Sequence, residues 1–420
     1  MLGHRALGCA ASLALALPLA LAGPAALEGA SATGKPNDGS SATPVLFEWQ
    51  RIALTTVFPP APPTPIPVGT LYLGFTSLAV NDAVQTSLQR GHTSVKAAIA
   101  QAAHDVLAEY FPTATASLDA SLSNTLASVE SSTSRDKGVR IGRSAAADMI
   151  ASRADDGRND TSVTFDLPPG PGVWTPPPTG MLAPWLGYVT PLVPTRPVAT
   201  GTPDALTSAV YAADFDEVKR IGSLTASPAD RSDHDTETAK FFTTNILIAY
   251  QDALLRYLET HPLGVSTSAR LLATINGSTG NAVIQTWRLK RELGFWRPNQ
   301  AIIGADSDDN PATVADPAWQ PLNVSLPPFA PNPPYPDYTS GHAALTSSFA
   351  QSVRNYLGDA VPLELHSSVT GTDRTYATLS SLESDAFMSR IWLGIHFRHA
   401  MDDGYSLGHR TANRVTAMLE

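Results

Sequence analysis

Three short segments in the second half of the chain carry side chains that bind anions and transfer protons. The first pairs Lys290 with Arg297, the second is Ser340-Gly341-His342, and the third pairs Arg390 with His396. Lys and Arg donate charge-assisted hydrogen bonds, and a hydroxyl and a glycine amide add neutral donors. Such donors suit a tetrahedral oxyanion, phosphate or vanadate, with a histidine beside it. The set therefore predicts an oxyanion site.

The first segment is expected at the end of a helix. Lys290 and Arg297 lie seven residues apart, which on a helix is two turns and about 20° short of full registry. Pro298 disfavours helix at Arg297, so this arginine is expected to project into a cleft. Taken alone, the pair more often marks a solvated charged face that ends at a proline.

The second segment is expected to open a helix over residues 341–356. Ser340 can cap that helix, whose first free amides form an anion site. Gly341 lets the backbone approach an oxygen closely, and His342 would stand beside that oxygen. Taken alone, a capped helix that carries an incidental histidine is an equally good interpretation.

The third segment needs a break in its helix. Arg390 and His396 would diverge by about 120° on an unbroken helix. Gly394 indicates that the helix bends or ends between them, which would bring both side chains to one ligand. Without the other two segments, a core-facing His396 is the commoner interpretation.

Hydrophobic periodicity predicts helices around these segments and little strand. The expected helices cover residues 94–111, 139–154, 235–258, 267–275, 281–290, 341–356, 378–393 and 404–419, with a break at 276–280. Proline-rich loops are expected at 58–68, 166–197 and 321–338. We therefore predict an all-α fold with long proline-rich loops, in which residues 33–70 are a flexible and proline-rich lead-in. Residues 71–420 would form one domain with the oxyanion site in 287–403.

Composition limits the functional classes. The 420 residues are 43% hydrophobic and 16% charged with a net charge of −10, and they show no basic stripe, which argues against a nucleic-acid partner. His4 and Arg5 precede an apolar run, so residues 1–32 are predicted as an export signal, with an N-terminal membrane anchor as the alternative. We expect a periplasmic or extracellular product without a membrane span once this signal is removed. The single cysteine, Cys9, would be removed with it.

Together the three segments resemble the signature of the vanadium-dependent haloperoxidase and type 2 phosphatidic acid phosphatase superfamily. The matching motifs are Lys290-x6-Arg297-Pro298, Ser340-Gly341-His342 and Ser389-Arg390-x5-His396. Their surroundings resemble the secreted bacterial haloperoxidase-like branch, in Phe295-Trp296-Arg297-Pro298, Tyr335-Pro336-x-Tyr338 and Gly394-Ile395-His396-Phe397. The resemblance covers about residues 71–420 and implies a mainly helical fold built around helical bundles.

The resemblance implies a role for each residue. His396 would be the ligand of the vanadium in vanadate, or a nucleophile that becomes phosphohistidine, and His342 would be the acid–base partner. The residues that would bind the oxyanion's oxygens are Lys290, Arg297, Ser340, Gly341 and Arg390.

The implied activity is oxidation of a halide by hydrogen peroxide, with vanadate as the cofactor. An aromatic lining from Trp287, Trp296 and Tyr335 and the absence of several spanning segments favour this activity. The alternative is a phosphatase that hydrolyses a phosphate ester or pyrophosphate without a cofactor. A non-catalytic oxyanion-binding protein is the third hypothesis.

Two positions depart from the family pattern. Thr339 stands where a proline usually precedes Ser-Gly-His. Ala400 stands four residues after His396, where the family commonly has an aspartate that orients the imidazole. Either Asp402 or Asp403 reaches back, or a backbone carbonyl substitutes, or the activity is weak. Oxyanion binding should survive this change better than catalysis.

Overall fold

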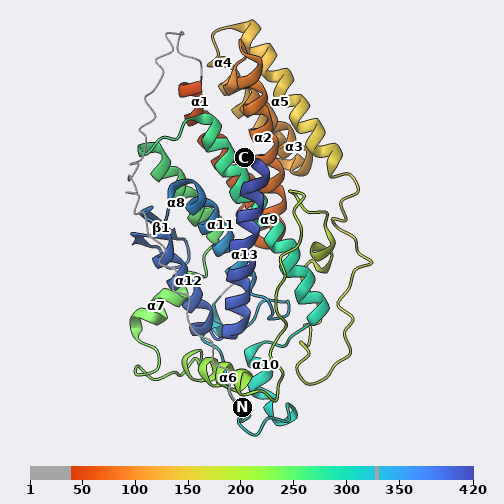
Figure 1. The fold of residues 1–420 in the computed structure, drawn as a ribbon, viewed down its shortest axis with the longest axis vertical. Coiled ribbons are helices and arrows are strands. Elements are labelled where there is room, and N and C mark those ends of the chain that lie inside the picture. The colour runs from red at the N-terminus through yellow and green to blue at the C-terminus, as the bar shows by residue number, and fades with distance from the viewer. Residues whose placement is uncertain (1–38, 327–330) are drawn as a thin grey trace, which may run out of the picture. The chain divides into compact units, whose positions relative to one another are not determined.

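Helices form nearly all the regular structure of the chain. The computed structural model describes residues 39–326 and 331–420, so the predicted export signal lies outside it. The described residues contain thirteen α-helices and one antiparallel hairpin, in which β1 (Leu363–Ser367) pairs with β2 (Thr372–Tyr376). Residues 38–420 form one compact unit (Figure 1). The all-α prediction is confirmed.

Five helices precede the functional segments. They are α1 (Gly39–Val57), α2 (Ile66–Arg90), α3 (Val95–Tyr110), α4 (Thr115–Ala127) and α5 (Ser132–Ser152). Small residues let α5 approach α3 closely: a Cβ atom at Gly138 would lie 2.3 Å from the Ser94 carbonyl oxygen, and one at Gly142 would lie 2.5 Å from that of Ala98. This part of the molecule is held together by apolar packing.

The prediction of a flexible lead-in over residues 33–70 is wrong where α1 forms, at Gly39–Val57. Leu46, Trp49 and Ala53 recur at helical spacing along it and are buried in the main hydrophobic core. The Gly, Ser and Thr residues at the start of this region suggested flexibility. Burial of the apolar residues that follow outweighs that local composition.

Three further helices and a long loop connect the N-terminal helices to the site. The helices are α6 (Ala209–Ile221), α7 (Asp233–Phe241) and α8 (Ile246–Thr260). The single helix predicted over 235–258 is therefore wrong, because α7 ends at Phe241 and the Asn245 side chain caps α8 by accepting from the Leu247 amide. The proline-rich loop 166–197 contains a short 3-10 helix, Pro184–Tyr188, and packs along α9.

Helix α9 (Val265–Leu293) is continuous, so the break predicted at 276–280 is wrong. Its glycines serve packing. A Cβ atom at Gly280 would lie 2.6 Å from Leu192, and one at Gly277 would lie 3.0 Å from Val193. The two glycines thus form a shallow surface that receives the proline-rich loop, and α9 runs on to deliver its last turns to the site.

The C-terminal helices complete the bundle. They are α10 (Pro298–Ile303), α11 (Gly341–Leu357), α12 (Leu379–Trp392) and α13 (Arg398–Leu419), so the last helix begins six residues before the predicted start at 404. Helix α11 packs against both α9 and α13 (Figure 1). Gly404 and Gly408 allow α13 to approach, because Cβ atoms there would lie 2.9 Å from the Ser340 carbonyl oxygen and 2.6 Å from that of Ala344.

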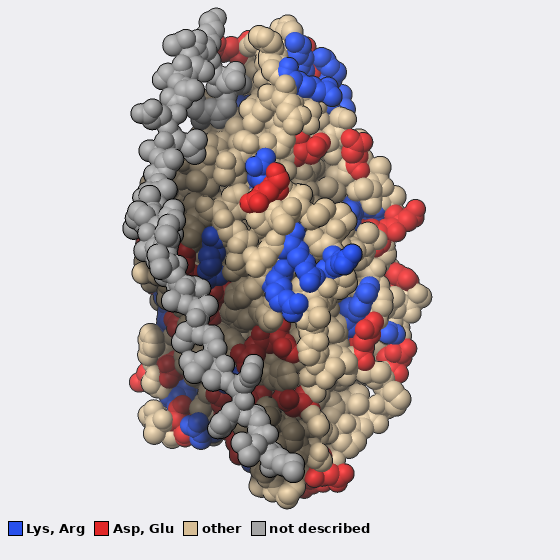
Figure 2. Space-filling view, in the orientation of Figure 1, with Lys and Arg blue, Asp and Glu red and all other residues tan. Residues whose placement is uncertain are grey.

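The surface carries a mixture of charges. On the face shown in Figure 2, acidic and basic side chains are intermingled and separated by wide uncharged areas. Among the described residues, no helix has the length and hydrophobicity needed to cross a bilayer.

Candidate active site

Lys290 lies in the last turn of α9 and is fully buried. Its ammonium group donates to two backbone carbonyl oxygens, those of Pro336 at 2.7 Å and Asp337 at 2.8 Å. Burial, and secondarily the nearby Arg297, lower the pKa of Lys290 well below its ordinary value. An anion bound beside it would oppose that shift.

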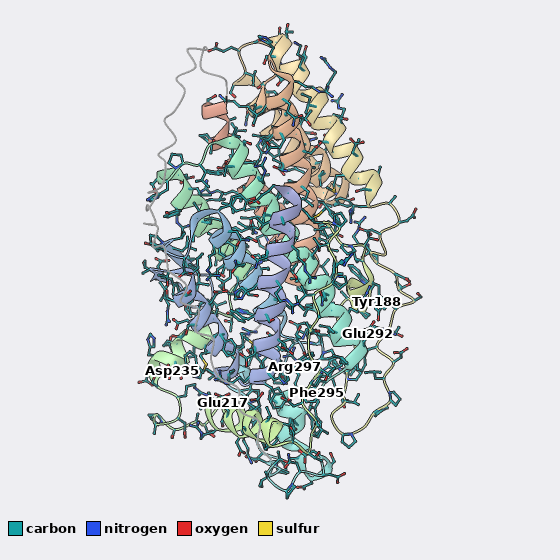
Figure 3. All side chains as sticks on the ribbon, viewed as in Figure 1. Tyr188, Glu217, Asp235, Glu292, Phe295 and Arg297 are labelled. Atoms are coloured by element: carbon teal, nitrogen blue, oxygen red, sulfur yellow. The ribbon has the colours of Figure 1, made fainter. Side chains whose placement is uncertain are left out.

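Arg297 immediately precedes α10, with the extended backbone that Pro298 favours. Its side chain is fully buried; Nε donates to the Tyr335 carbonyl oxygen at 2.9 Å and Nη1 to that of Ile395 at 2.6 Å. Figure 3 shows Arg297 beside Phe295, beyond the end of α9. Arg297 belongs to the first motif. Its hydrogen bonds thus connect the loop before Ser340, in the second motif, to the segment that carries His396, in the third.

Ser340 and Gly341 open α11 as predicted. The Ser340 hydroxyl accepts from the Ala343 amide at 3.3 Å, and the Ser340 amide donates to the Ala400 carbonyl oxygen at 2.9 Å. A Cβ atom at Gly341 would lie 3.1 Å from the Trp287 ring. Gly341 is therefore needed where the start of α11 packs against α9.

His342 faces a pocket and has an unpaired ring nitrogen. Its Nε2 atom is enclosed and makes no hydrogen bond within the described protein. Its ring meets Phe242 edge-on with 6.3 Å between centroids, and Nδ1 lies 3.5 Å from the Thr346 hydroxyl. Burial, followed by the positive charge of Arg390, lowers the pKa of His342 well below its ordinary value.

Arg390 reaches the same pocket from α12. The helix ends at Trp392, and Gly394 turns the chain with a φ of +74°, which confirms the predicted break. The guanidinium Nη1 donates weakly to the Phe242 carbonyl oxygen at 3.5 Å, while Nε is buried without a partner among the described residues. Burial lowers the pKa of Arg390 to about 10, so it remains a cation at neutral pH.

His396 follows this turn and is 2% exposed. Its Nε2 atom lies 3.5 Å from Arg297 Nη1, and its Nδ1 atom lies 2.6 Å from Asp337 Oδ1. The Nδ1–Asp337 contact is within ion-pair distance, although its alignment departs from that of a good hydrogen bond. Burial first, then Arg297, Lys290 and Arg390, lower the pKa of His396, which favours the neutral imidazole.

Asp337 is the residue that the sequence reasoning missed. Its carboxylate is fully buried, and burial raises its pKa to about 7 against the opposing effect of Arg297 and Lys290. Neither alternative carboxylate reaches His396: Asp403 accepts from the Tyr338 hydroxyl, and Asp402 is exposed. A signal was present, because Asp337 is the only charged residue in the proline-rich segment 321–338.

The pocket in front of these residues measures about 90 Å³. A single water needs only about 10–15 Å³ on the same measure, so the space accommodates several waters or a small anion. Its lining includes Gly341, His342 and Arg390, together with Trp287, Tyr335 and Phe242. The other predicted site residues lie buried behind this lining: Lys290, Arg297, Ser340 and His396.

Aromatic rings and the proline-rich loops shape this pocket. The Tyr335 ring lies over both Lys290 Nζ, at 5.1 Å, and the Arg297 guanidinium, at 5.0 Å. Trp287 Nε1 donates to the Leu182 carbonyl oxygen at 3.0 Å, and the Leu182 amide donates to that of Pro334 at 2.9 Å. The predicted aromatic lining is confirmed for Trp287 and Tyr335; Trp296 packs instead in the cluster around α6 and α10.

The donors of this cluster fit a vanadate or phosphate ion. Buried polar atoms are normally paired, and Arg390 Nε and His342 Nε2 are not. Both belong to residues that line the pocket, next to the first turn of α11. A small oxyanion there would accept from these atoms and offset the charge of the buried cations.

Comparison with known proteins agrees with this chemistry. Residues 270–420, which carry all seven predicted site residues, match the family model of the VCPO second helical-bundle domain. Residues 270–420 therefore carry a domain of this family. The vanadium chloroperoxidase of Curvularia inaequalis is 36% identical over 98 residues, which are 22% of this chain and 15% of that enzyme. The match thus spans less than a sixth of that relative's length.

Solved structures of vanadium-dependent haloperoxidases share the fold across most of this chain. A bacterial vanadium-dependent iodoperoxidase superposes with a TM-score of 0.68 and 16% identity, covering 91% of this chain and 96% of that one. The holo form of a bacterial vanadium-dependent chloroperoxidase superposes with a TM-score of 0.63 and 16% identity, covering 84% and 92%. At this identity the superpositions establish the architecture alone.

Proposed function

We propose that the protein is a vanadium-dependent haloperoxidase, which oxidises a halide with hydrogen peroxide. The observation that carries this proposal is the convergence of two fully buried cationic side chains, Lys290 and Arg297, a partly buried one, Arg390, and two histidines, with two nitrogen atoms left unpaired at the pocket. The solved structures with the same fold are those of a vanadium-dependent iodoperoxidase and a vanadium-dependent chloroperoxidase, which favours this chemistry over the alternative.

Each residue of the cluster has a defined task in this proposal. Lys290, Arg297 and Arg390 would hold the vanadate oxygens, with the Ser340 hydroxyl and the Gly341 amide as neutral donors. His396 Nε2 would be the protein ligand of vanadium. Bound vanadate supplies a Lewis-acidic centre that activates peroxide toward halide attack.

His342 would move the proton that the reaction requires. Oxidation of a halide X⁻ by H₂O₂ consumes one proton and gives HOX and water. In the pocket His342 is held neutral by burial and by Arg390. A neutral imidazole can accept a proton from incoming peroxide and return it to the departing oxygen. The adjacent oxyanion would stabilise the imidazolium form that exists between these two transfers.

A phosphatase is the second candidate, since the same cluster suits phosphoryl transfer. The specific observation is the 3.5 Å contact between Arg297 Nη1 and His396 Nε2, in which Nε2 accepts and is therefore unprotonated, as a histidine nucleophile that attacks phosphorus requires. His342 would then protonate the leaving alcohol. Vanadate would inhibit this reaction, because it occupies the place of the transferred phosphoryl group.

Parallel assays with and without orthovanadate test the proposal. The purified protein would be given peroxide, bromide and a phenolic dye in one assay, and an aryl phosphate in the other. We expect bromination that depends on added vanadate. Aryl phosphate hydrolysis that vanadate inhibits, without bromination, would overturn the haloperoxidase proposal in favour of the phosphatase.

A further inference from the structure

We propose that Asp337 is the positioning residue of His396 and replaces the carboxylate that the family pattern places at the position of Ala400. This inference rests on the proposed function only in assuming that His396 Nε2 binds the oxyanion's central atom. It concerns the orientation of His396 Nε2, so it holds for either vanadate or phosphoryl chemistry.

The contact is close and shielded from water. Asp337 Oδ1 lies 2.6 Å from His396 Nδ1, with side-chain exposures of 0% and 3%. Water competes little for a carboxylate in such a place, so its interaction with the imidazole is stronger than at the surface. The pair is therefore able to fix the orientation of the ring.

The backbone of Asp337 is anchored on both sides. Its amide donates to the Phe295 carbonyl oxygen at 2.9 Å, and its own carbonyl oxygen accepts from Lys290 at 2.8 Å. The flanking Tyr335 carbonyl oxygen accepts from Arg297. The two cations of the first motif thus hold the loop that carries the carboxylate, and the loop in turn holds His396.

This arrangement selects one form of the imidazole. A carboxylate 2.6 Å from Nδ1 stabilises the tautomer whose proton is on that nitrogen, so that Nε2 carries the lone pair. That lone pair is the one that a vanadium or phosphorus centre requires. Without the carboxylate, the proton could reside on Nε2 instead, and the ring would be free to rotate away.

Ala400 and Asp337 border the same space. Both line a small pocket together with Phe397, the neighbour of His396, and Ala400 is 1% exposed in the first turn of α13. The Ala400 carbonyl oxygen also accepts from the Ser340 amide, three residues after Asp337. The carboxylate has therefore moved from α13 to the loop before α11 while still serving one ring nitrogen.

A purely structural role for Asp337 makes a different prediction. Its Oδ1 atom also lies 3.9 Å from Arg297 Nη1, so the carboxylate could act only by balancing buried charge. In that case its loss would lower the thermal midpoint, and a carboxylate returned to position 400 would not restore oxyanion affinity selectively. Binding and stability must therefore be measured on the same variants.

The test compares four full-length proteins: wild type, Asp337→Ala, the double variant Asp337→Ala/Ala400→Asp, and Asp402→Asn. Equilibrium dialysis with orthovanadate gives the dissociation constant, and calorimetry gives the thermal midpoint. We expect Asp337→Ala to weaken vanadate binding by roughly 10- to 100-fold, the usual effect of losing such a supporting carboxylate. The double variant should recover most of that loss, and the exposed Asp402→Asn control should match wild type.

Two results would overturn the inference. One is a folded Asp337→Ala protein that binds vanadate as tightly as wild type. The other is a folded double variant that binds no more tightly than the single variant. If Asp337→Ala fails to fold, the isosteric Asp337→Asn replaces it, with the same expected loss. A wild type that binds no vanadate would instead contradict the proposed function, which is a distinguishable outcome.

Discussion

Helix α9 passes through two buried polar clusters, one near its middle and one at its C-terminal end. In the middle cluster, Gln251 Nε2 donates to Asn276 Oδ1 at 2.8 Å, and Asn276 Nδ2 donates to the Ser77 hydroxyl at 2.8 Å. Gln50 closes the ring by donating to Gln251 Oε1 at 2.8 Å and accepting from Ser77. All four side chains are uncharged and find partners within the cluster.

The cluster at the end of α9 is built in the opposite way. It contains the buried cationic side chains of Lys290 and Arg297 and the partly buried Arg390, and it leaves the enclosed Arg390 Nε and His342 Nε2 atoms unpaired. Burying charged and unpaired groups opposes folding. The neutral middle cluster, whose side chains pair with one another, stabilises the bundle. The charged cluster at the end of α9 has unpaired atoms and is stabilised by a ligand. The first cluster therefore serves the fold and the second serves binding.

The largest effect should come from His396. Replacing it with Ala removes the proposed vanadium ligand or nucleophile, so we expect turnover in either assay to fall by at least about 10³-fold. Because the ring is buried against Asp337, its removal also leaves a cavity, so the thermal midpoint is measured to show that the variant is folded at the assay temperature. Exposed His366 pairs with Asp373 in the β1–β2 hairpin and does not line the pocket, so His366→Ala is the matched control. Retained activity in His396→Ala would refute the site assignment.

Arg390→Lys should weaken oxyanion binding without unfolding the protein. The substitution keeps a positive charge but loses the planar donor fork and the unpaired Nε atom. We expect vanadate affinity to fall by roughly 10- to 100-fold, about 1.4–2.8 kcal/mol of binding free energy. Titration calorimetry would measure this loss. Equal affinity in the two proteins would show that Arg390 contributes only its charge.

Asn276→Ala, in the cluster at the middle of α9, should lower stability and leave oxyanion binding unchanged, the reverse of Arg390→Lys. It leaves Gln251 Nε2 without its acceptor and Ser77 without a donor. We expect the free energy of unfolding to fall by about 1–3 kcal/mol, with vanadate affinity unchanged. Denaturant unfolding and vanadate titration of the same sample give both values. An Asn276→Ala protein of normal stability but weak vanadate binding would contradict the assignment of the middle cluster to stability and the end cluster to binding.

The smallest predicted effect is a pH dependence of stability. Burial and Arg390 lower the pKa of His342 from its ordinary value of 6.5. Below pH 6.5 the unfolded chain therefore binds a proton at His342 that the folded protein does not bind. The free energy of unfolding should therefore fall with decreasing pH by up to about 1.4 kcal/mol per unit for this residue. The slope persists down to the folded-state pKa.

The His342 contribution is isolated by comparing wild type with His342→Gln between pH 7.5 and 5.5. The variant should show a shallower dependence, and adding phosphate should flatten the wild-type curve, because an anion favours the imidazolium. Parallel curves for the two proteins would contradict the assigned shift.

The residues that bind the oxyanion could be predicted from the sequence more fully than the residues that position them. Lys290 and Arg297 share one helix end and Ser340 to His342 share one turn, so local spacing was sufficient for both motifs. Gly394 likewise indicated the turn that separates Arg390 from His396. These are short-range relations, and backbone geometry alone fixes them.

Long-range packing accounts for the errors. The contact between Asp337 and His396 joins two loops that local spacing does not relate. Gly277 and Gly280 resemble a helix break in sequence, but they receive the side chains of Leu192 and Val193 from a distant loop. In both cases the decisive partner lies far away along the chain, where periodicity gives no information.

The most direct test of the charged cluster at the end of α9 is calorimetric titration of the purified protein with orthovanadate, repeated in excess phosphate. We predict one vanadate per chain, competition by phosphate, and a thermal midpoint that rises on binding because only the folded cluster binds the anion. Absence of vanadate binding at millimolar concentration, in a folded protein, would contradict the claim that these buried cations exist to hold an oxyanion.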